Sequence, residues 1–175
     1  MNLTIPMDNR DIDYFVEGMQ LQPHPEGGFY REVYRSEGVI PQSVLPEKFT
    51  GSRAYATGIY FLISQNNFSA FHRISSDELW HFYTGGALQV HVIHTDGRYE
   101  LIRLGNRIHE GEVFQAMVPA GAWFASECAP GVAFSLVGCT VAPGFDFSDF
   151  ELAKAELLSG QFPAQGELIR RLCRG

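Results

Sequence analysis

Short runs of β-branched and aromatic residues, separated by glycine, proline and Asn/Asp turns, fill the middle of this 175-residue chain. Such runs are typical of strands that pack one face against a core. They predict strands at residues 29–35, 57–64, 68–74, 78–83, 87–95, 99–104, 112–118, 122–128 and 132–141. Short strands at a spacing of roughly 8–12 residues favour a sandwich, a jelly roll or a small barrel.

The two ends of the chain have a different pattern. Residues 9–19 place apolar side chains on one helical face, and residues 148–158 and 165–172 are amphipathic at helical spacing. Residues 37–52 contain prolines and glycine and predict a loop that could cover a site. With no linker composition and no repeat, we expect one domain over residues 1–175, with a strand core at about 27–142 and a helical tail at about 148–173.

Charge and composition exclude several classes of function. The chain has 13 Lys and Arg against 20 Asp and Glu, a net charge of −7, and no basic block, so a nucleic-acid partner is not expected. No apolar run approaches the roughly 20 residues of a membrane helix, and the first ten residues lack the features of a signal peptide. Three scattered cysteines suit a reducing compartment, and we expect a cytoplasmic protein without a membrane partner.

One stretch carries the candidate chemistry, because it places His72, Glu78 and His81 within ten positions. These residues can be metal ligands, an acid/base pair in an apolar pocket, or a satisfied polar patch. Strand parity puts Glu78 on one face with Trp80 and Phe82, and His81 on the other face. If residues 68–74 and 78–83 pair as a hairpin, His72 and Glu78 meet inside the barrel.

The spacing around His72 resembles the first motif of the cupins, which is Gly, five residues, His-x-His, three or four residues, Glu, six residues, Gly. Here Asn66 stands at the first glycine, His72 and Ile74 at the two histidines, Glu78 at the glutamate and Gly85 at the second glycine. The second cupin motif contains Pro-x-Gly, two residues, His, three residues, Asn. In this chain it reads Pro119-Ala-Gly121, with Phe124 at the histidine and Cys128 at the asparagine.

The departures from these motifs concern the metal ligands. Metal-binding cupins hold their ion with three His and one Glu, whereas here His72 and Glu78 match while Ile74 and Phe124 replace two imidazoles. The resemblance therefore implies an incomplete ligand set, and a divalent metal would need His81 or His91 as well. A site of this kind is also similar to metal-free cupins, notably sugar-nucleotide epimerases, which use a histidine as base.

Longer segments resemble one largely uncharacterised family of the cupins, whose jelly roll is of the RmlC-like kind. They are Leu-Gln-Pro-His-Pro-Glu-Gly-Gly-Phe-Tyr-Arg-Glu from residue 21, Ser-Asp-Glu-Leu-Trp-His-Phe-Tyr from 76, Val-Pro-Ala-Gly-Ala-Trp from 118 and Val-Gly-Cys-Thr-Val-Ala-Pro-Gly-Phe-Asp-Phe from 137. The resemblance implies a mainly β fold, the double-stranded β-helix of the cupins, with short helices at both ends. It also implies a homodimer, and it transfers no settled activity.

We interpret the chain as a small-molecule enzyme or binding protein with a pocket in the barrel mouth. In an epimerase- or isomerase-like reaction on a polar or sugar-like molecule, His72 would be the base, Glu78 its partner and His81 a third candidate. The candidates for substrate contact are Tyr60, Arg73, Trp80, Phe82, Phe124, His24 and Glu26. The aromatic residues are equally consistent with the core, and Arg73 is a possible ion-pair partner of Glu78. A metal-dependent dioxygenase or isomerase, and a non-catalytic binding or scaffold protein, are the alternatives.

Overall fold

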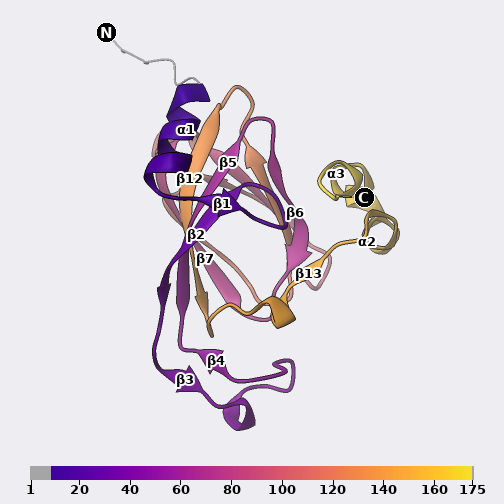
Figure 1. Ribbon diagram of the computed structural model, residues 1–175. Coiled ribbons are helices and arrows are strands. Elements are labelled where there is room, and N and C mark those ends of the chain that lie inside the picture. Colours follow the sequence, from indigo (N-terminus) through magenta and orange to yellow (C-terminus); the bar gives the residue numbers. More distant parts are fainter. Residues whose placement is uncertain (1–8, 175) are drawn as a thin grey trace.

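The structure, a computed structural model, describes residues 9–174 of the chain and side chains from residue 12 onward. Two antiparallel sheets face each other and enclose the core (Figure 1). The larger sheet has six strands in the order β1 (Gln22–Pro23), β2 (Phe29–Arg35), β5 (Thr57–Ser64), β12 (Phe134–Ala142), β7 (Asp77–Gly85) and β10 (Gln115–Val118). The smaller sheet has five, in the order β13 (Glu151–Leu152), β6 (Phe68–Arg73), β11 (Trp123–Cys128), β8 (Leu88–Ile93) and β9 (Tyr99–Leu104).

The inner faces of both sheets form one apolar core, because alternate side chains of each strand point inward. Along β7 the residues Glu78, Trp80 and Phe82 are buried, whereas Leu79 and Tyr83, at alternate positions, are exposed. The mainly β fold predicted from the strand spacing is therefore confirmed. So is the division of β7 into two faces.

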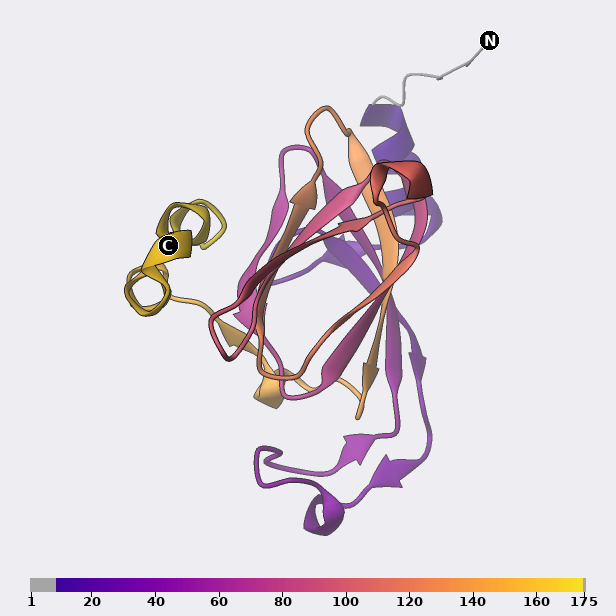
Figure 2. The same ribbon diagram turned by 180° about the vertical axis from the view of Figure 1, so that it is seen from behind.

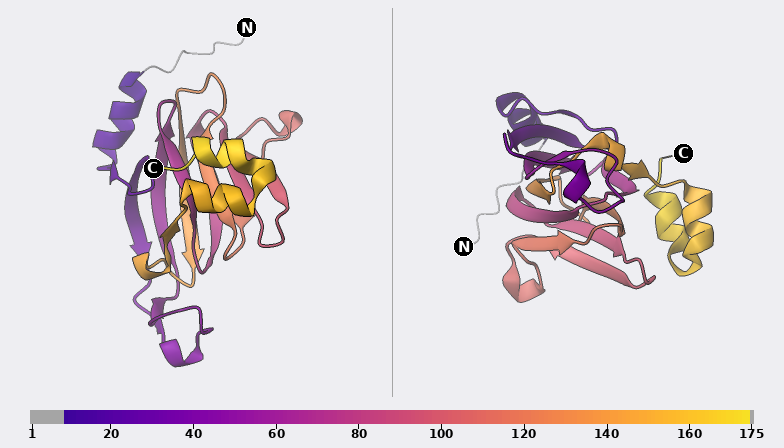
Figure 3. Two further views of the ribbon diagram at one scale, coloured as in Figure 1. Left: turned by 90° about the vertical axis from the view of Figure 1, so that its right-hand side faces the viewer. Right: turned by 90° about the horizontal axis from the view of Figure 1, so that it is seen from below.

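Helices cover the outer faces of the two sheets. Helix α1 (Asn9–Gly18) packs Phe15 against Phe134 of the larger sheet, with ring centroids 5.3 Å apart. Helices α2 (Ala155–Gln161) and α3 (Gly166–Arg171) lie on the smaller sheet (Figure 3), where Leu158 and Ile169 are buried against the outer side of β6 and β11. None of the helices described here has the length and apolar character needed to cross a membrane.

Two details of the strand and helix predictions are wrong. β6 and β7 do not pair as a hairpin, because the turn after β6 carries the chain from the smaller sheet to the larger one. The helix predicted from residue 148 begins only at Ala155, since the preceding residues form the short helix η3 (Phe147–Asp149) and strand β13, which pairs with β6. The predicted hairpin of β8 and β9 is confirmed, and its turn uses Gly97 at φ +85°.

The segment between β2 and β5 projects beyond one end of the barrel (Figures 1 and 2). It contains β3 (Val39–Ile40), β4 (Arg53–Ala54) and the short helix η1 (Gln42–Val44). Because this arm leaves from the last residue of β2 and returns at the first residue of β5, its base lies at the open end of the barrel. Two further short helices, η2 (Ile108–Glu110) and η4 (Pro163–Gln165), lie in connecting loops.

Candidate active site

A cavity of about 380 Å³ lies between the two sheets at the end from which the arm projects. This volume is within the range of small-molecule sites. Its lining combines titratable groups, aromatic rings and aliphatic side chains from both sheets and from the loops that close them. The lining residues are Gln22, His24, Glu26, Tyr30, Glu32, Arg35, Thr57, Ile59, His72, Ile74, Glu78, Cys139, Val141, Phe145, Asp146 and Phe147.

His72, near the end of β6, is held in one tautomer by a hydrogen bond to the backbone of Ala70. Its side chain is 3% exposed, and its Nδ1 lies 2.7 Å from the carbonyl oxygen of Ala70. A carbonyl oxygen only accepts, so Nδ1 carries the hydrogen and donates it. The other ring nitrogen, Nε2, lies 3.1 Å from Oε2 of Glu26. A lone pair and a carboxylate oxygen at this distance need a proton between them, so His72 and Glu26 share one.

Burial decides on which side of this pair the proton resides. Burial, followed by the nearby charge of Glu78, raises the pKa of Glu26 well above its usual value. Burial lowers the pKa of His72 to about 3, and its hydrogen bond to Ala70 only partly opposes this shift. Both shifts favour a neutral carboxylic acid that donates to a neutral imidazole. We call His72 and Glu26 the dyad.

Glu26 reaches His72 because its turn lies directly on β6. The amide of Ala70 donates to the carbonyl oxygen of Glu26 at 2.9 Å, and the hydroxyl of Ser69 donates to Oε1 at 2.8 Å. Gly27, at φ +114°, makes this approach possible, since a Cβ there would lie 2.0 Å from the carbonyl oxygen of Phe68. The turn that carries His24 and Glu26 therefore forms one wall of the cavity.

His24 contributes a second neutral imidazole to the same wall. Its Nδ1 accepts a hydrogen bond from the backbone amide of Glu26 at 3.3 Å, so its hydrogen is on Nε2. The ring packs edge-on to Tyr30, with centroids 4.5 Å apart. Burial lowers the pKa of His24 to about 4, so it is uncharged at neutral pH.

Glu78 faces the dyad from the other sheet, since β7 belongs to the larger sheet. The residue is 8% exposed, and burial raises the pKa of its carboxyl group to about 7, although a hydrogen bond from the Cys139 thiol opposes the shift. The charge of Glu78 raises the pKa of Glu26, which places the two carboxyl groups within electrostatic reach. The cavity thus holds two proton-carrying groups on opposite walls.

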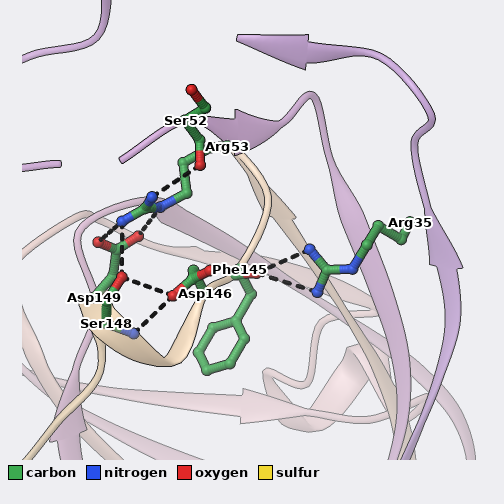
Figure 4. Close-up of polar contacts among 7 residues, drawn as sticks. All are labelled: Arg35, Ser52, Arg53, Phe145, Asp146, Ser148 and Asp149. Atoms are coloured by element: carbon green, nitrogen blue, oxygen red, sulfur yellow. Dashed lines mark hydrogen bonds and ion pairs between the residues drawn. The ribbon is translucent and has the colours of Figure 1, made fainter. Parts of the chain in front are cut away.

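The rim of the cavity is a segment after β12 that we call the clasp, residues 143–149. Phe145 and Phe147 of the clasp line the cavity, and the guanidinium of Arg35 donates to the carbonyl oxygen of Phe145 at 3.3 Å (Figure 4). Arg53 of the arm donates to both carboxylate oxygens of Asp149, at 2.6 and 2.7 Å, with both side chains 3% exposed. The clasp is therefore tied to both ends of the arm.

Four of the predicted site residues lie together in the cavity, namely His72, Glu78, His24 and Glu26. Trp80, Phe82 and Phe124 instead belong to the buried core, and Phe124 supports the His72 ring at a centroid distance of 4.0 Å.

Three other predicted residues lie on the outer surfaces of the sheets. His81 contacts the hydroxyl of Thr140 at 3.1 Å, and the Tyr60 ring packs against Tyr83. Arg73 pairs with Glu151 at 2.7 Å and lies over the ring of Trp123, so it is not a partner of Glu78. Neighbouring residues on a strand point to opposite faces, and this places Arg73 and His72 on different sides of β6.

Several lining residues were not predicted from the sequence. Cys139 lies beside Glu78, and Tyr30 and Arg35 line the cavity from a strand distant from both in sequence. Alternation along β12 places Cys139 on the inner face of the strand, so its position in the cavity was predictable from the sequence.

The metal site of other cupins does not fit these side chains. Ile74 and Phe124 occupy two ligand positions, and both ring nitrogens of His72 are engaged, by Ala70 and Glu26. His91, considered as an additional ligand, lies elsewhere and contacts Tyr99 and Glu127. Among the residues that the structure describes, no three His, Cys, Asp or Glu side chains are grouped so as to hold an ion. We therefore derive no step through a metal.

Comparisons with known proteins concern the family and the fold of the chain. Residues 13–153 match the family model described as cupin superfamily, DUF985. An uncharacterised protein of Saccharomyces cerevisiae is 28% identical over 165 residues, 89% of this chain and 82% of that protein. A hypothetical protein from Leishmania major has a TM-score of 0.86 at 35% identity, over 93% of this chain and 98% of that one. A protein from Shewanella oneidensis has a TM-score of 0.82 at 38% identity, over 96% and 99%.

A more distant likeness concerns the fold alone. Oxalate decarboxylase from Bacillus subtilis superimposes with a TM-score of 0.51 at 14% identity, over 86% of this chain and 36% of that enzyme. At this identity, nothing about reaction or ligands is transferred.

Proposed function

Because this chain belongs to the DUF985 family of the cupin superfamily, whose fold leaves the reaction open, we propose its function from the cavity itself. The proposal is an isomerase or epimerase that moves a proton on a small, polar, sugar-like molecule. The observation that carries it is the dyad, in which His72 Nε2 lies 3.1 Å from Glu26 Oε2 while Nδ1 is fixed by Ala70.

The two walls of the cavity would play complementary parts. Glu78, with a pKa of about 7, is ionised in a large fraction of molecules at neutral pH, so it can remove a proton from carbon next to a carbonyl group. The C–H electrons then form the enolate, which takes the dyad's proton on the opposite face of the same carbon, so that Glu78 ends as the neutral acid and the dyad ends without its proton. In the reverse direction the dyad accepts a proton on His72 and Glu78 donates one. No oxidant, reductant or second substrate is needed.

This assignment modifies the roles expected from sequence. His72 remains a proton-transfer residue, but its hydrogen-bonding partner is Glu26, and Glu78 acts from the other wall. The apolar rings of Phe145 and Phe147 at the rim would limit the access of water during transfer.

Solvent deuterium exchange tests the proposal before the substrate is identified. The protein is incubated in D₂O with pooled metabolites that carry a C–H bond next to a carbonyl group, and incorporation is read by mass spectrometry. We expect exchange into a small set of compounds, reduced about 10²- to 10⁴-fold by His72→Asn or Glu26→Gln. His109→Asn is the matched control, because that side chain is 81% exposed.

The outcomes separate the alternatives. Binding of a metabolite without exchange would favour a non-catalytic binding protein. Exchange that disappears with a chelator and returns with a divalent ion would favour the metal-dependent alternative. Exchange that His72→Asn and Glu26→Gln leave intact would refute the role of the dyad. A homodimer and a cytoplasmic location remain predictions, the former checked by light scattering on the purified protein.

A further inference from the structure

Glu78 is a buried carboxyl group with no cation beside it in the described part of the chain. It lines the cavity and is 8% exposed, and its hydrogen-bond donor is the thiol of Cys139. Of the titratable groups near it, Glu26 and His72 share one proton and His24 is neutral, so none supplies a positive charge. A buried carboxylate without a positive partner is costly, and a cationic ligand would remove that cost.

The other charged side chains of the cavity also favour a cationic ligand. Its lining contains four carboxyl groups, those of Glu26, Glu32, Glu78 and Asp146, and one guanidinium, that of Arg35. The guanidinium is already engaged, because its Nη2 lies 2.6 Å from Oε2 of Glu32. Asp146 accepts hydrogen bonds from Ser148 and its pKa is lowered, so the rim carries a negative charge. A bound anion would meet this negative charge, and the one guanidinium among the described lining residues is already paired with Glu32.

Aromatic rings and the Nε2–H of His24 are two further features of the cavity that suit a cationic, hydroxylated ligand. Tyr30, Phe145 and Phe147 line the cavity, and the last two lie with ring centroids 5.0 Å apart. Ring faces of this kind attract ammonium groups. His24 is 7% exposed at its side chain, and within the described residues its Nε2–H has no hydrogen-bond acceptor. A ligand oxygen would satisfy it.

We infer that the cavity selects a small organic cation, namely a hydroxylated molecule with a primary ammonium group, such as an amino sugar or an amino alcohol. The ammonium group lies against Glu78, the aromatic rings flank it, and a ligand oxygen accepts from His24. This inference rests on the proposed function in one respect, that the same cavity holds the substrate.

Isothermal titration with a charge series tests the inference directly. Glucosamine, glucose and glucuronate present a similar ring with an ammonium group, no charge and a carboxylate, and tetramethylammonium provides a cation without a ring. We expect glucosamine to bind about tenfold or more tightly than glucose, glucuronate to bind most weakly, and tetramethylammonium to compete with glucosamine. Glucose or glucuronate binding as tightly as glucosamine would overturn the inference. So would a failure of both cations to bind.

A pair of variants assigns the preference to Glu78. Glu78→Gln should reduce the ratio of glucosamine to glucose affinity to near one. Glu151→Gln makes the same change in net charge on the outer surface, where that side chain is 56% exposed, and should leave the ratio unchanged. A ratio that survives Glu78→Gln would overturn the inference. Deuterium exchange is scored separately, so cation binding without exchange contradicts the proposed function alone, and exchange of neutral metabolites alone contradicts only this inference.

Discussion

Glu78→Gln should change how the stability of the protein depends on pH. Burial raises the pKa of this carboxyl group in the folded protein to about 7, from 4.5 when it is not perturbed. Between these values the folded state binds more protons than the unfolded state. The stability that Glu78 contributes is therefore complete below pH 4.5 and is lost as the pH rises through about 7.

The size of the effect follows from the two pKa values. With 4.5 unfolded and about 7 folded, the linkage relation gives a loss of about 0.8 kcal/mol by pH 5 and about 3.3 kcal/mol by pH 8. The wild type should therefore lose about 2.5 kcal/mol more than Glu78→Gln between pH 5 and pH 8. The lowered pKa values of His24 and His72 act in the opposite direction below pH 6.5. They are present in both proteins, so they largely cancel in the comparison.

Urea unfolding at pH 5, 6, 7 and 8, at one protein concentration, measures this difference. Glu47→Gln is the control, because that residue is exposed, and it should follow the wild type. The charge of Glu78 also raises the pKa of Glu26, so the variant should relax that shift too and enlarge the difference. If Glu78→Gln and the wild type lose stability in parallel from pH 5 to pH 8, the assignment of a buried, proton-binding Glu78 is refuted.

Three other substitutions test the framework of the site by urea unfolding. Arg53→Ala should lower the free energy of unfolding by about 3–5 kcal/mol, because it leaves the buried carboxylate of Asp149 unpaired. Arg73→Ala, at an exposed ion pair, should lower it by less than about 1 kcal/mol. Equal losses would contradict the idea that Arg53 holds the clasp. Gly27→Ala should lower the melting temperature, because its Cβ would overlap the backbone of β6. Gly160→Ala, in open space on α2, should leave the melting temperature unchanged or raise it. A lower melting temperature for Gly160→Ala than for Gly27→Ala would contradict the close contact between the Glu26 turn and β6. Leu158→Ala should cost about 2–5 kcal/mol if α2 packs as described, and a cost near zero would show that it does not.

Local patterns were sufficient for much of the fold. The turn of β8 and β9 was predictable because Asp-Gly between strand-forming runs favours a tight turn, and Gly97 adopts the positive φ that this turn uses. The burial of Glu78 and the outward position of His81 followed from strand parity alone. The alternation of side chains along a strand shows which residues share a face, and it does not depend on the rest of the chain.

The partners of the site residues were not predictable in this way. The sequence placed His72 and Glu78 in adjacent strands and suggested a hairpin, but the strands belong to different sheets. Pairing of strands depends on the path of the whole chain, which neighbouring residues do not specify. The same is true of Arg73, whose partner Glu151 comes from a strand that the sequence indicated as part of a helix.

By itself, then, the sequence determined a mainly β chain with helical ends, the inward faces of its strands, and a cupin-like motif in which two metal ligands are replaced. These features depend on short-range periodicity and on residue type, which a sequence shows directly. Only the tertiary structure decided that Glu26 shares a proton with His72, that Glu78 faces them from the other sheet, and that its carboxyl group has no cation beside it among the described residues. Contacts such as that of Ser69 with Glu26, 43 residues apart, form where two sheets and a turn meet. The protonation of these groups depends on how completely that meeting excludes water.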